Sequence, residues 1–548
     1  MIGKLFKFMS SLRHLPATHN LTRDNIRRLQ ALTEMVNSLP LETEFISSTA
    51  TDMSGGAPKI PKLKVLRTEN FHLNERNFKS LLDAIAEPTC TVKLAIDKDS
   101  NLKPLLLACG NYDEHMSRLA RFHDQIKRLD RDELLDFKYK GVRVFEAAYS
   151  EALSACIASD HWQSRAINKT PDAIIDHFFA HDEHLEVLRK CCAAAMFWTN
   201  FWVNHRKNFK ENIYTYDAAL IFSGAFIYGA VLIQLLSHRR GRCFVCEGFI
   251  TGEDYFFEES YHPVPNGSRI GFSTVLNSYY AKISDKDALD RHRAEAIDRL
   301  RHMRNKNVTQ PAPEPLPPQL KGRSVTLVVG QVVNDFSLIS GQGSVLCSIP
   351  AYRALFERIL ENPDAMIVFK GHPWERKKTN IRSDFTKERL EQFVQSLPAE
   401  QRSRVWIVSD WNIKQLLRVS RYVVTICSQA AIEAAMEGIK PITIGGTYYG
   451  TGGFSHNFAT PELAGAAIRD DAVNPELSLA EYAGFEQFMV AMFTQHLVSN
   501  QSVGQNSVLS KLRPIQRYAR KPFGGIETSI APTYDLSQLR LNGSVEIS

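Results

Sequence analysis

The chain has 548 residues, of which 44% are hydrophobic and 23% charged, a composition typical of globular proteins. This length exceeds what one hydrophobic core serves, so we expect roughly two to four domains. The 66 basic and 60 acidic residues give a formal net charge of +6. Such a charge permits an anionic ligand or membrane surface but lacks the strongly basic footprint of nucleic-acid-binding proteins. The nine cysteines form no disulfide framework, which predicts free thiols in a reducing compartment.

Residues 1–135 are predicted to form a mainly helical N-terminal region. The opening "MIGKLFKFMSSLRHLP" has no secretory signal. Its apolar residues, which include Ile2 and Phe6, indicate either an amphipathic surface helix or a helix packed on its own domain, and we favour the latter. Within this region, "KLKVLRTE" and "CTVKLAID" are typical of strands, and they flank the helical "NERNFKSLLDAIAE".

The stretch "AALIFSGAFIYGAVLIQLLS" at 218–237 carries no charge and has the length of about 20 residues that a membrane helix needs. It divides, however, into a strand, a Ser-Gly turn and a helix, and the strand-like "GRCFVCEGF" follows. A βαβ unit explains this pattern better than a membrane span. In the second strand, Cys243 and Cys246 are three residues apart and so point to opposite faces. We therefore interpret them as structural and expect no metal site.

We assign residues 136–307 to a first Rossmann-like domain and 308–321 to a linker containing five prolines. Prolines cannot continue a helix or a central strand. From 322 to 470, near-continuous apolar strands alternate with helices, which predicts a second Rossmann-like domain with a parallel sheet covered on both faces. Residues 471–548 are predicted to be a helix and a basic tail. The predicted fold class is thus α/β, with two Rossmann-type domains facing a cleft, as in the GT-B architecture, and an additional helical N-terminal region.

Polar side chains follow several predicted strands of the 322–470 region at their carboxyl ends. Ligands of open α/β sheets bind beyond those ends, so these side chains predict a binding site. They are Gln331, Asn334 and Asp335 after "TLVVG", Lys370 and His372 in "FKGHP", Ser428 and Gln429 after "YVVTIC", and Tyr448 and Tyr449 after "PITIGG".

The segment "SQAAIEAAMEG" predicts a helix whose N-terminus faces this site. Unpaired N–H groups and the helix dipole at such an end favour a phosphate. Ser428 there is either an ordinary N-cap or a ligand-binding hydroxyl. Glu433 is either a solvated residue or an acceptor for ribose hydroxyls, and the apolar helix around it favours the second interpretation.

Three further residues indicate acid–base or anion chemistry. Lys370 and His372 can donate to one anion, whereas a histidine after a strand can also be a hydrogen-bonded structural residue. Asp335 is either a turn or cap residue, or a carboxylate that serves as nucleophile or electrostatic stabiliser. Glu247 ends a strand of the first domain and is either such a partner or merely paired with a basic neighbour. Two carboxylates, one from each domain, suit glycosyl transfer.

Five segments resemble the bacterial capsule polysaccharide biosynthesis family, which includes the retaining β-Kdo glycosyltransferases that use CMP-Kdo. They are "CEGFITG", "HPVPNGSRIG", "VVGQVVNDFSL", "VFKGHP" and "SQAAIEAAMEGIKPITIGGTYYGTGG", and the resemblance covers roughly residues 215–460. The resemblance implies a metal-independent GT-B enzyme with no cofactor. The sequence departs from the family pattern at Ala431 and Ile432, where a glycine is usual, and at "YYGTGG", where an "FYAGWG"-like run is usual. These departures leave another CMP-linked ulosonic acid or another nucleotide sugar open as the donor.

The resemblance also implies residue roles. Asp335 would be the nucleophile, Glu247 the acid/base, and Lys370 and His372 would bind the phosphate or the sugar carboxylate, with His372 counted among the catalytic residues. The cytidine nucleotide would be held mainly by Ser428 and Glu433. The full predicted donor-binding set is Gln331, Lys370, Ser428, Gln429, Glu433 and Tyr449.

Three functions remain open. The first is transfer of a sugar, most simply Kdo, to a glycan or glycolipid acceptor for a surface polysaccharide (capsule or lipopolysaccharide). It would take place in the cytoplasm, with peripheral contact to the inner membrane through the N-terminal helix and the basic tail. The second is a nucleotide-sugar epimerase, which needs no acceptor. The third is a non-catalytic scaffold subunit of a polysaccharide assembly or export complex, for which Asp335 and Glu247 would be dispensable. No nucleic-acid partner is expected.

Overall fold

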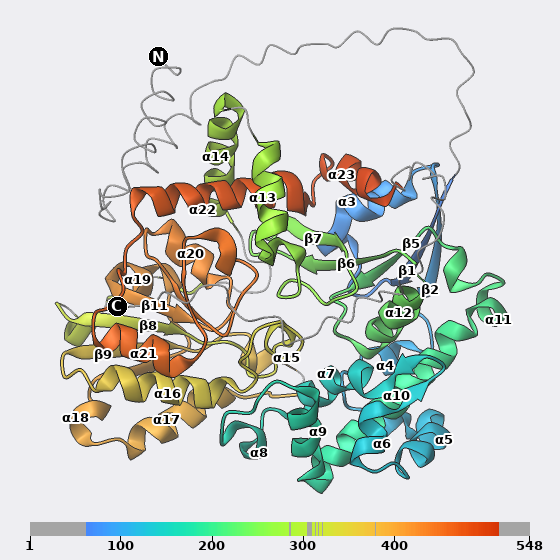
Figure 1. The fold of residues 1–548 in the computed structure, drawn as a ribbon, viewed down its shortest axis with the longest axis horizontal. Coiled ribbons are helices and arrows are strands. Elements are labelled where there is room, and N and C mark those ends of the chain that lie inside the picture. The colour runs from blue at the N-terminus through green and yellow to red at the C-terminus, as the bar shows by residue number, and fades with distance from the viewer. Residues whose placement is uncertain are drawn as a thin grey trace, which may run out of the picture. The chain divides into compact units, whose positions relative to one another are not determined.

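The computed structural model describes residues 62–513, apart from 240, 284–285, 304–309, 313, 316, 321 and 379. The predicted helix at the N-terminus and nearly all of the predicted basic tail lie outside the described residues. Contacts divide the chain into a unit of residues 1–512 and a second of residues 513–548. The first unit contains two α/β sheets, which are coloured along the chain in Figure 1.

The first sheet has six strands in the order β14-β7-β6-β5-β1-β2. Strands β2, β1, β5 and β6 are parallel, and β7 and β14 extend the sheet antiparallel to them. The bounds are β1 (Leu63–Glu69), β2 (Cys90–Ile96), β5 (Ala218–Phe222), β6 (Cys243–Gly248), β7 (Asp254–Glu259) and β14 (Leu497–Ser499).

This sheet differs from the domain boundaries drawn from the sequence. The strands β1 and β2 match the predicted strands but belong to the same sheet as β5 and β6, so the first α/β unit begins before residue 136. The helical stretch after β2 is therefore an insertion between β2 and β5. At the other end, β14 returns the chain from the 471–548 region to this sheet, because its backbone pairs with β7.

The inserted helices pack around one long central helix, α10, which contacts α5, α7, α9 and α12. A short hairpin of β3 (Lys138–Tyr139) and β4 (Val142–Arg143) interrupts them. The helices are α4 (Lys103–Leu106), α5 (Met116–Ile126), α6 (Arg131–Asp136), α7 (Val144–Cys156), α8 (Asp160–Gln163), α9 (Pro171–Phe179), α10 (Asp182–Val203) and α11 (His205–Phe209).

Helices cover both faces of the first sheet (Figure 1). Helices α3 (Glu75–Ala86) and α23 (Gly504–Leu512) pack on one face. Helix α12 (Ile227–His238), together with α7 and α10, packs on the other. Cys243 and Cys246 are buried in these two opposite cores, as the spacing predicted. All nine cysteines lie among the described residues, and none forms a disulfide.

The apolar stretch at 218–237 forms strand β5, a turn and helix α12, so the predicted βα arrangement is confirmed. Ser223 and Gly224 in the turn have positive φ angles of 56° and 80°, which turn the chain sharply from strand to helix. Within the described part of the chain, no helix combines the length and the apolar character needed to cross a membrane.

The second sheet is wholly parallel, with the strand order β10-β9-β8-β11-β12-β13. Counted along the chain this is the order 3-2-1-4-5-6 of dinucleotide-binding folds. The strands are β8 (Ser324–Val329), β9 (Ala365–Lys370), β10 (Val405–Val408), β11 (Ser420–Thr425), β12 (Ile442–Ile444) and β13 (His456–Phe458). Five of these strands, β8 to β12, lie where the apolar runs predicted them.

Two layers of helices enclose the second sheet (Figure 1). Helices α16 (Ser348–Leu360), α17 (Phe385–Ser396) and α21 (Pro461–Arg469) pack on one face. Helices α19 (Ile413–Val419) and α20 (Ala430–Met436) pack on the other. Apolar residues of β8 alternate between the layers, since Val328 faces the first and Leu327 the second. Burial on both faces explains why the strands read as continuous apolar runs.

The remaining helices connect and brace the sheets. Helix α22 (Leu479–Ala491) contacts α13 (Ser273–Lys282) and α14 (Lys286–Arg301). A π-helical turn, Met492–His496, continues α22 into β14. Short helices α15 (Phe336–Ile339) and α18 (Ala399–Arg402) complete the second α/β unit. The predicted GT-B-like α/β class is confirmed, with two Rossmann-type sheets whose strand ends line one cavity.

Candidate functional site

A cavity of about 880 Å³ is lined by residues that follow the carboxyl ends of strands from both sheets. Three groups come from each sheet. From the first sheet these are His72 after β1, Ser223 and Phe226 after β5, and Glu247 and Gly248 at the end of β6. From the second sheet they are Gln331, Asn334 and Asp335 after β8, Lys370 and His372 at β9, and Ser428, Gln429 and Glu433 after β11. In both sheets the strand order reverses at this point, between β1 and β5 and between β8 and β11, which is where such sheets bind ligands.

Glu247 is a half-buried carboxyl at the end of β6, and its Oε1 accepts from the Gly248 amide at 3.1 Å. Burial raises its pKa to about 7, and the charge of Asp335 adds to that rise, while His72 acts in the opposite direction. Glu247 and Asp335 therefore interact electrostatically although they come from different sheets. A carboxyl group with a pKa near neutrality can exchange a proton with a substrate hydroxyl.

Asp335 both caps a helix and lines the cavity. Its Oδ1 accepts from the Ser337 amide at 2.8 Å, as the N-cap of α15, and its Oδ2 accepts from Gln331 Nε2 at 3.1 Å. The cap interpretation and the catalytic one are therefore compatible. The two donors fix the carboxylate in one orientation, as a nucleophile requires.

His372 and Lys370 lie together at the end of β9. The Trp374 amide donates to His372 Nδ1 at 3.1 Å, so the neutral ring carries its proton on Nε2. Burial lowers the pKa of His372 to about 4, although the Asp335 carboxylate opposes the shift. Lys370 is buried, and its Nζ donates to the Ser409 carbonyl at 3.1 Å. At neutral pH the pair thus offers one neutral N–H donor and one cation.

Ser428 and Glu433 flank the first turn of α20. The Ser428 Oγ accepts from the amide of Ala430, the first residue of α20, at 3.2 Å, and Ser428 also lines the cavity. The N-cap position itself is Gln429, so the N-cap interpretation of Ser428 is wrong by one residue. Glu433 lines the same cavity, and burial raises its pKa to about 7 against the charges of Lys414 and Lys370. The Glu433 side chain faces the cavity and not the core, which explains how the otherwise apolar helix accommodates a carboxyl group.

Three buried side-chain oxygens in the cavity lining have no hydrogen-bond partner among the described residues. They are Gln331 Oε1, Asn334 Oδ1 and Gln429 Oε1. A buried acceptor without a partner costs about 1–3 kcal/mol, and a bound ligand or water relieves that cost. Gln331 and Gln429 were predicted to bind a ligand, and their free acceptors favour hydroxyl or amino groups on it.

The structure corrects the prediction for Tyr449. This residue is fully buried and is absent from the cavity lining. Its hydroxyl group donates to the Ser428 carbonyl at 2.8 Å, so it supports the loop beneath the cavity. The aromatic ring packs in the apolar core, stacked on Phe454, and that packing explains why it does not face the ligand.

Several lining residues were missed from the sequence, notably His72, Lys377 and Lys378. His72 follows β1 and stacks on Phe222 with ring centroids 4.6 Å apart. Its position after a strand was a usable signal, but that strand was assigned to another region. Lys377 and Lys378 come directly after "GHPWER". With Lys370 they give the cavity three lysines, which suits an anionic ligand.

The inserted helices hold the loop that carries Asp335. Lys169 is partly buried, and its Nζ donates to the carbonyls of Leu338, Gly341 (2.5 Å) and Gly343 (3.2 Å). Asn334 Nδ2 donates to the Ser154 carbonyl at 2.9 Å. The sequence alone did not reveal these contacts, because their partners lie more than a hundred residues apart.

Residues 280–479 match the model of the family described as capsule polysaccharide biosynthesis protein. This match covers the second sheet and confirms the resemblance predicted from the motifs. No curated protein sequence matches the chain.

Solved structures resemble parts of the chain. The β-Kdo 2,4-transferase of Thermosulfurimonas dismutans KpsC is 17% identical, with 52% of this chain and 81% of that chain covered at a TM-score of 0.37. The β-Kdo 2,7-transferase of the same protein is 15% identical, with 56% and 87% covered at a TM-score of 0.32. A UDP-N-acetylglucosamine 2-epimerase homologue from Listeria monocytogenes is 12% identical, with 82% and 96% covered at a TM-score of 0.29.

Proposed function

We propose that this protein is a glycosyltransferase of bacterial surface polysaccharide synthesis. The donor we propose is CMP-Kdo, and the acceptor is a glycan or glycolipid hydroxyl group. Support comes from the family match over residues 280–479, from the motif resemblance, and above all from one feature of the cavity. That feature is the pair of carboxylates, Glu247 and Asp335, which come from different sheets and interact across a single site.

The proposed reaction retains configuration through two displacements at the anomeric carbon. In the first, an Asp335 oxygen forms a bond to the anomeric carbon. At the same time the bond between that carbon and the CMP phosphate oxygen breaks, and CMP leaves with the electron pair. In the second, Glu247 takes the proton of the acceptor hydroxyl, whose oxygen bonds to the anomeric carbon as the Asp335 ester bond breaks. Each carboxylate thus has a separate task, and Asp335 is regenerated.

The donor would occupy the side of the cavity formed by the second sheet. Lys370, Lys377 and Lys378 supply positive charge for the phosphate and the sugar carboxylate, and the His372 N–H adds a donor. This charge is why we propose transfer without a metal ion. Ser428, Gln429 and Glu433 lie where a cytidine ribose could accept and donate hydrogen bonds, and Gln331 has a free acceptor.

We further propose that the protein works at the cytoplasmic face of the inner membrane. The support is sequence composition: basic and apolar residues alternate in residues 1–16, and "SKLRPIQRYARK" near the C-terminus is strongly basic. Such segments are attracted to anionic lipid. A lipid-linked acceptor would then lie near the enzyme.

The test is incubation of the purified protein with CMP-Kdo and a panel of glycolipid acceptors, following CMP release and product mass. We expect acceptor-dependent transfer that Asp335→Ala and Glu247→Ala both lose. Glu400→Gln, a change of an exposed carboxylate on α18, should keep full activity. A modified sugar nucleotide formed without acceptor would instead indicate an epimerase. CMP binding without chemistry on any acceptor would contradict the proposal and favour the scaffold function.

A further inference from the structure

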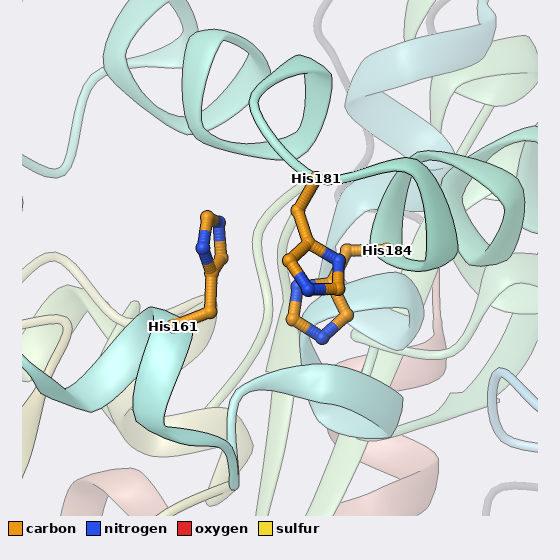
Figure 2. Close-up of side chains that lie close together, drawn as sticks. All are labelled: His161, His181 and His184. Atoms are coloured by element: carbon orange, nitrogen blue, oxygen red, sulfur yellow. The ribbon is translucent and has the colours of Figure 1, made fainter.

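Four histidines cluster in the inserted helices, outside the residues that line the cavity. His161 lies in α8, His177 in α9, and His181 and His184 at the start of α10. Figure 2 shows the side chains of His161, His181 and His184 close together. Within the described ranges, these three are the one group whose potential ligand atoms could share a metal ion, since those atoms all lie within 4.8 Å of one another.

The hydrogen bonds around the cluster leave ring nitrogens free. His161 Nε2 lies 3.0 Å from the His177 carbonyl oxygen. A carbonyl oxygen only accepts hydrogen bonds, so His161 Nε2 carries the proton and His161 Nδ1 carries the lone pair. Such a hydrogen bond from the second ring nitrogen fixes the tautomer and the ring orientation of a metal-binding histidine. His181 Nδ1 and His184 Nδ1 are buried and have no hydrogen-bond partner among the described residues.

The rings are also held in place. The His181 and His184 rings stack with centroids 4.1 Å apart, and the His161 ring lies 4.7 Å from His181. Trp162 packs against His177 at 4.4 Å on the apolar side of the cluster.

We propose that His161, His181 and His184 bind a transition-metal dication, with Zn²⁺ as the best fit. Imidazole nitrogen is a preferred zinc ligand, and three such ligands leave one tetrahedral position for water. Zinc–nitrogen bonds of about 2.0–2.1 Å place the nitrogens about 3.4 Å apart. The potential ligand atoms lie within 4.8 Å of one another, so the imidazole rings would move closer together on binding.

The metal would join α8 to the start of α10, and α8 is in turn bound to the second α/β unit. Arg389 of α17 forms an ion pair with Asp160, its Nε lying 2.7 Å from Oδ1. Gln163 Oε1 accepts from the Ile349 amide of α16 at 3.2 Å. A metal here would therefore stabilise the helices that contact the second unit.

The test uses the full-length protein, stripped with a chelator and then titrated with Zn²⁺ by calorimetry. We expect one Zn²⁺ per chain, and an unfolding temperature that rises with Zn²⁺ concentration, as binding to the native state requires. His181→Gln and His184→Gln should each weaken binding by more than about 100-fold, because loss of even an outer-shell partner costs about 10- to 100-fold. The control is His302→Gln, whose exposed histidine is outside the cluster.

Equal zinc affinity in the wild type and both cluster variants would overturn the proposal, as would no binding by the wild type. Circular dichroism of each metal-free variant separates loss of the ligand from loss of the fold. If a variant does not fold, the wild type still tests the proposal, through the number of Zn²⁺ ions bound per chain and the dependence of its unfolding temperature on Zn²⁺.

Discussion

Glu247 is the residue whose ionisation the proposed reaction depends on most. Its pKa is raised to about 7 by burial and by Asp335, and only the deprotonated form can accept the proton of an acceptor hydroxyl. We therefore predict that kcat/KM for transfer rises as the pH increases through about 7 and then levels off. The measurement is CMP release across a pH series at fixed ionic strength.

The Glu247→Gln variant provides the matched comparison for that profile. It should lose about 10²- to 10⁴-fold in rate, the usual contribution of a general base, and its remaining activity should show no rise near pH 7. Glu400→Gln should keep both the rate and the profile. A wild-type profile that is flat through neutrality would show that Glu247 is not the base.

Two adjacent tyrosines make a contrasting pair for stability. The Tyr449 hydroxyl donates to the Ser428 carbonyl, whereas the buried Tyr448 hydroxyl has no partner among the described residues. We predict that Tyr449→Phe lowers the free energy of unfolding by about 1 kcal/mol, while Tyr448→Phe leaves it unchanged or raises it. Urea denaturation measures both, and equal effects would refute the supporting role given to Tyr449.

At the scale of elements, the inserted helices hold the loop that presents Asp335. Lys169→Met would remove the cation that bonds three carbonyls of this loop. We predict a loss of about 1–3 kcal/mol in the free energy of unfolding, because the carbonyl of buried Leu338 and two partly buried carbonyls lose their donor, together with a lower kcat for transfer. Lys98→Met, at an exposed position, should change stability by less than about 0.5 kcal/mol.

Stability and activity of Lys169→Met should change together if the loop positions Asp335. A variant with wild-type kcat despite reduced stability would instead mean that the loop keeps its conformation without Lys169.

The second sheet could be predicted from the sequence because each strand is buried on both faces and is punctuated by turns. The runs around Val328, Phe369 and Val424 lie in β8, β9 and β11, and the polar residues after them reach one cavity. The rule that ligands lie beyond strand ends thus located eight of the nine predicted site residues in the cavity lining.

The first sheet could not be assembled in this way. An insertion of about 120 residues separates β2 from β5, so sequence proximity gave no signal that His72 would face Glu247. The prediction that Tyr449 binds the ligand was wrong for a different reason, since an aromatic residue after a strand packs equally well in the core. Pairing and packing over such separations depend on contacts that local patterns do not encode.

At the scale of the whole molecule, the chain finishes its first sheet with its last described elements. Strand β14 pairs with β7, and α23 packs against α3. Arg242 donates to the carbonyls of Lys511 and Leu512 at 2.8 and 2.7 Å, which fixes the end of α23. The stability of the first sheet therefore depends on residues that follow the second sheet in sequence.

Leu512 tests this dependence, because its side chain is 1% exposed in the core under α23. We predict that Leu512→Ala lowers the free energy of unfolding by about 2–5 kcal/mol, as loss of a buried leucine does. Leu463 is 55% exposed, and Leu463→Ala should be nearly neutral. Urea denaturation compares them, and similar small effects would mean that α23 contributes little to the fold.

In the proposed reaction, Asp335 and Glu247 divide the two steps of sugar transfer. The most direct measurement is intact-protein mass, followed by peptide mapping, after CMP-Kdo is added to the Glu247→Gln variant in the presence of acceptor. We predict a Kdo adduct on Asp335, because the first displacement still occurs while the second is slowed. An adduct on another residue, or normal transfer by Asp335→Asn, would show that Asp335 is not the nucleophile.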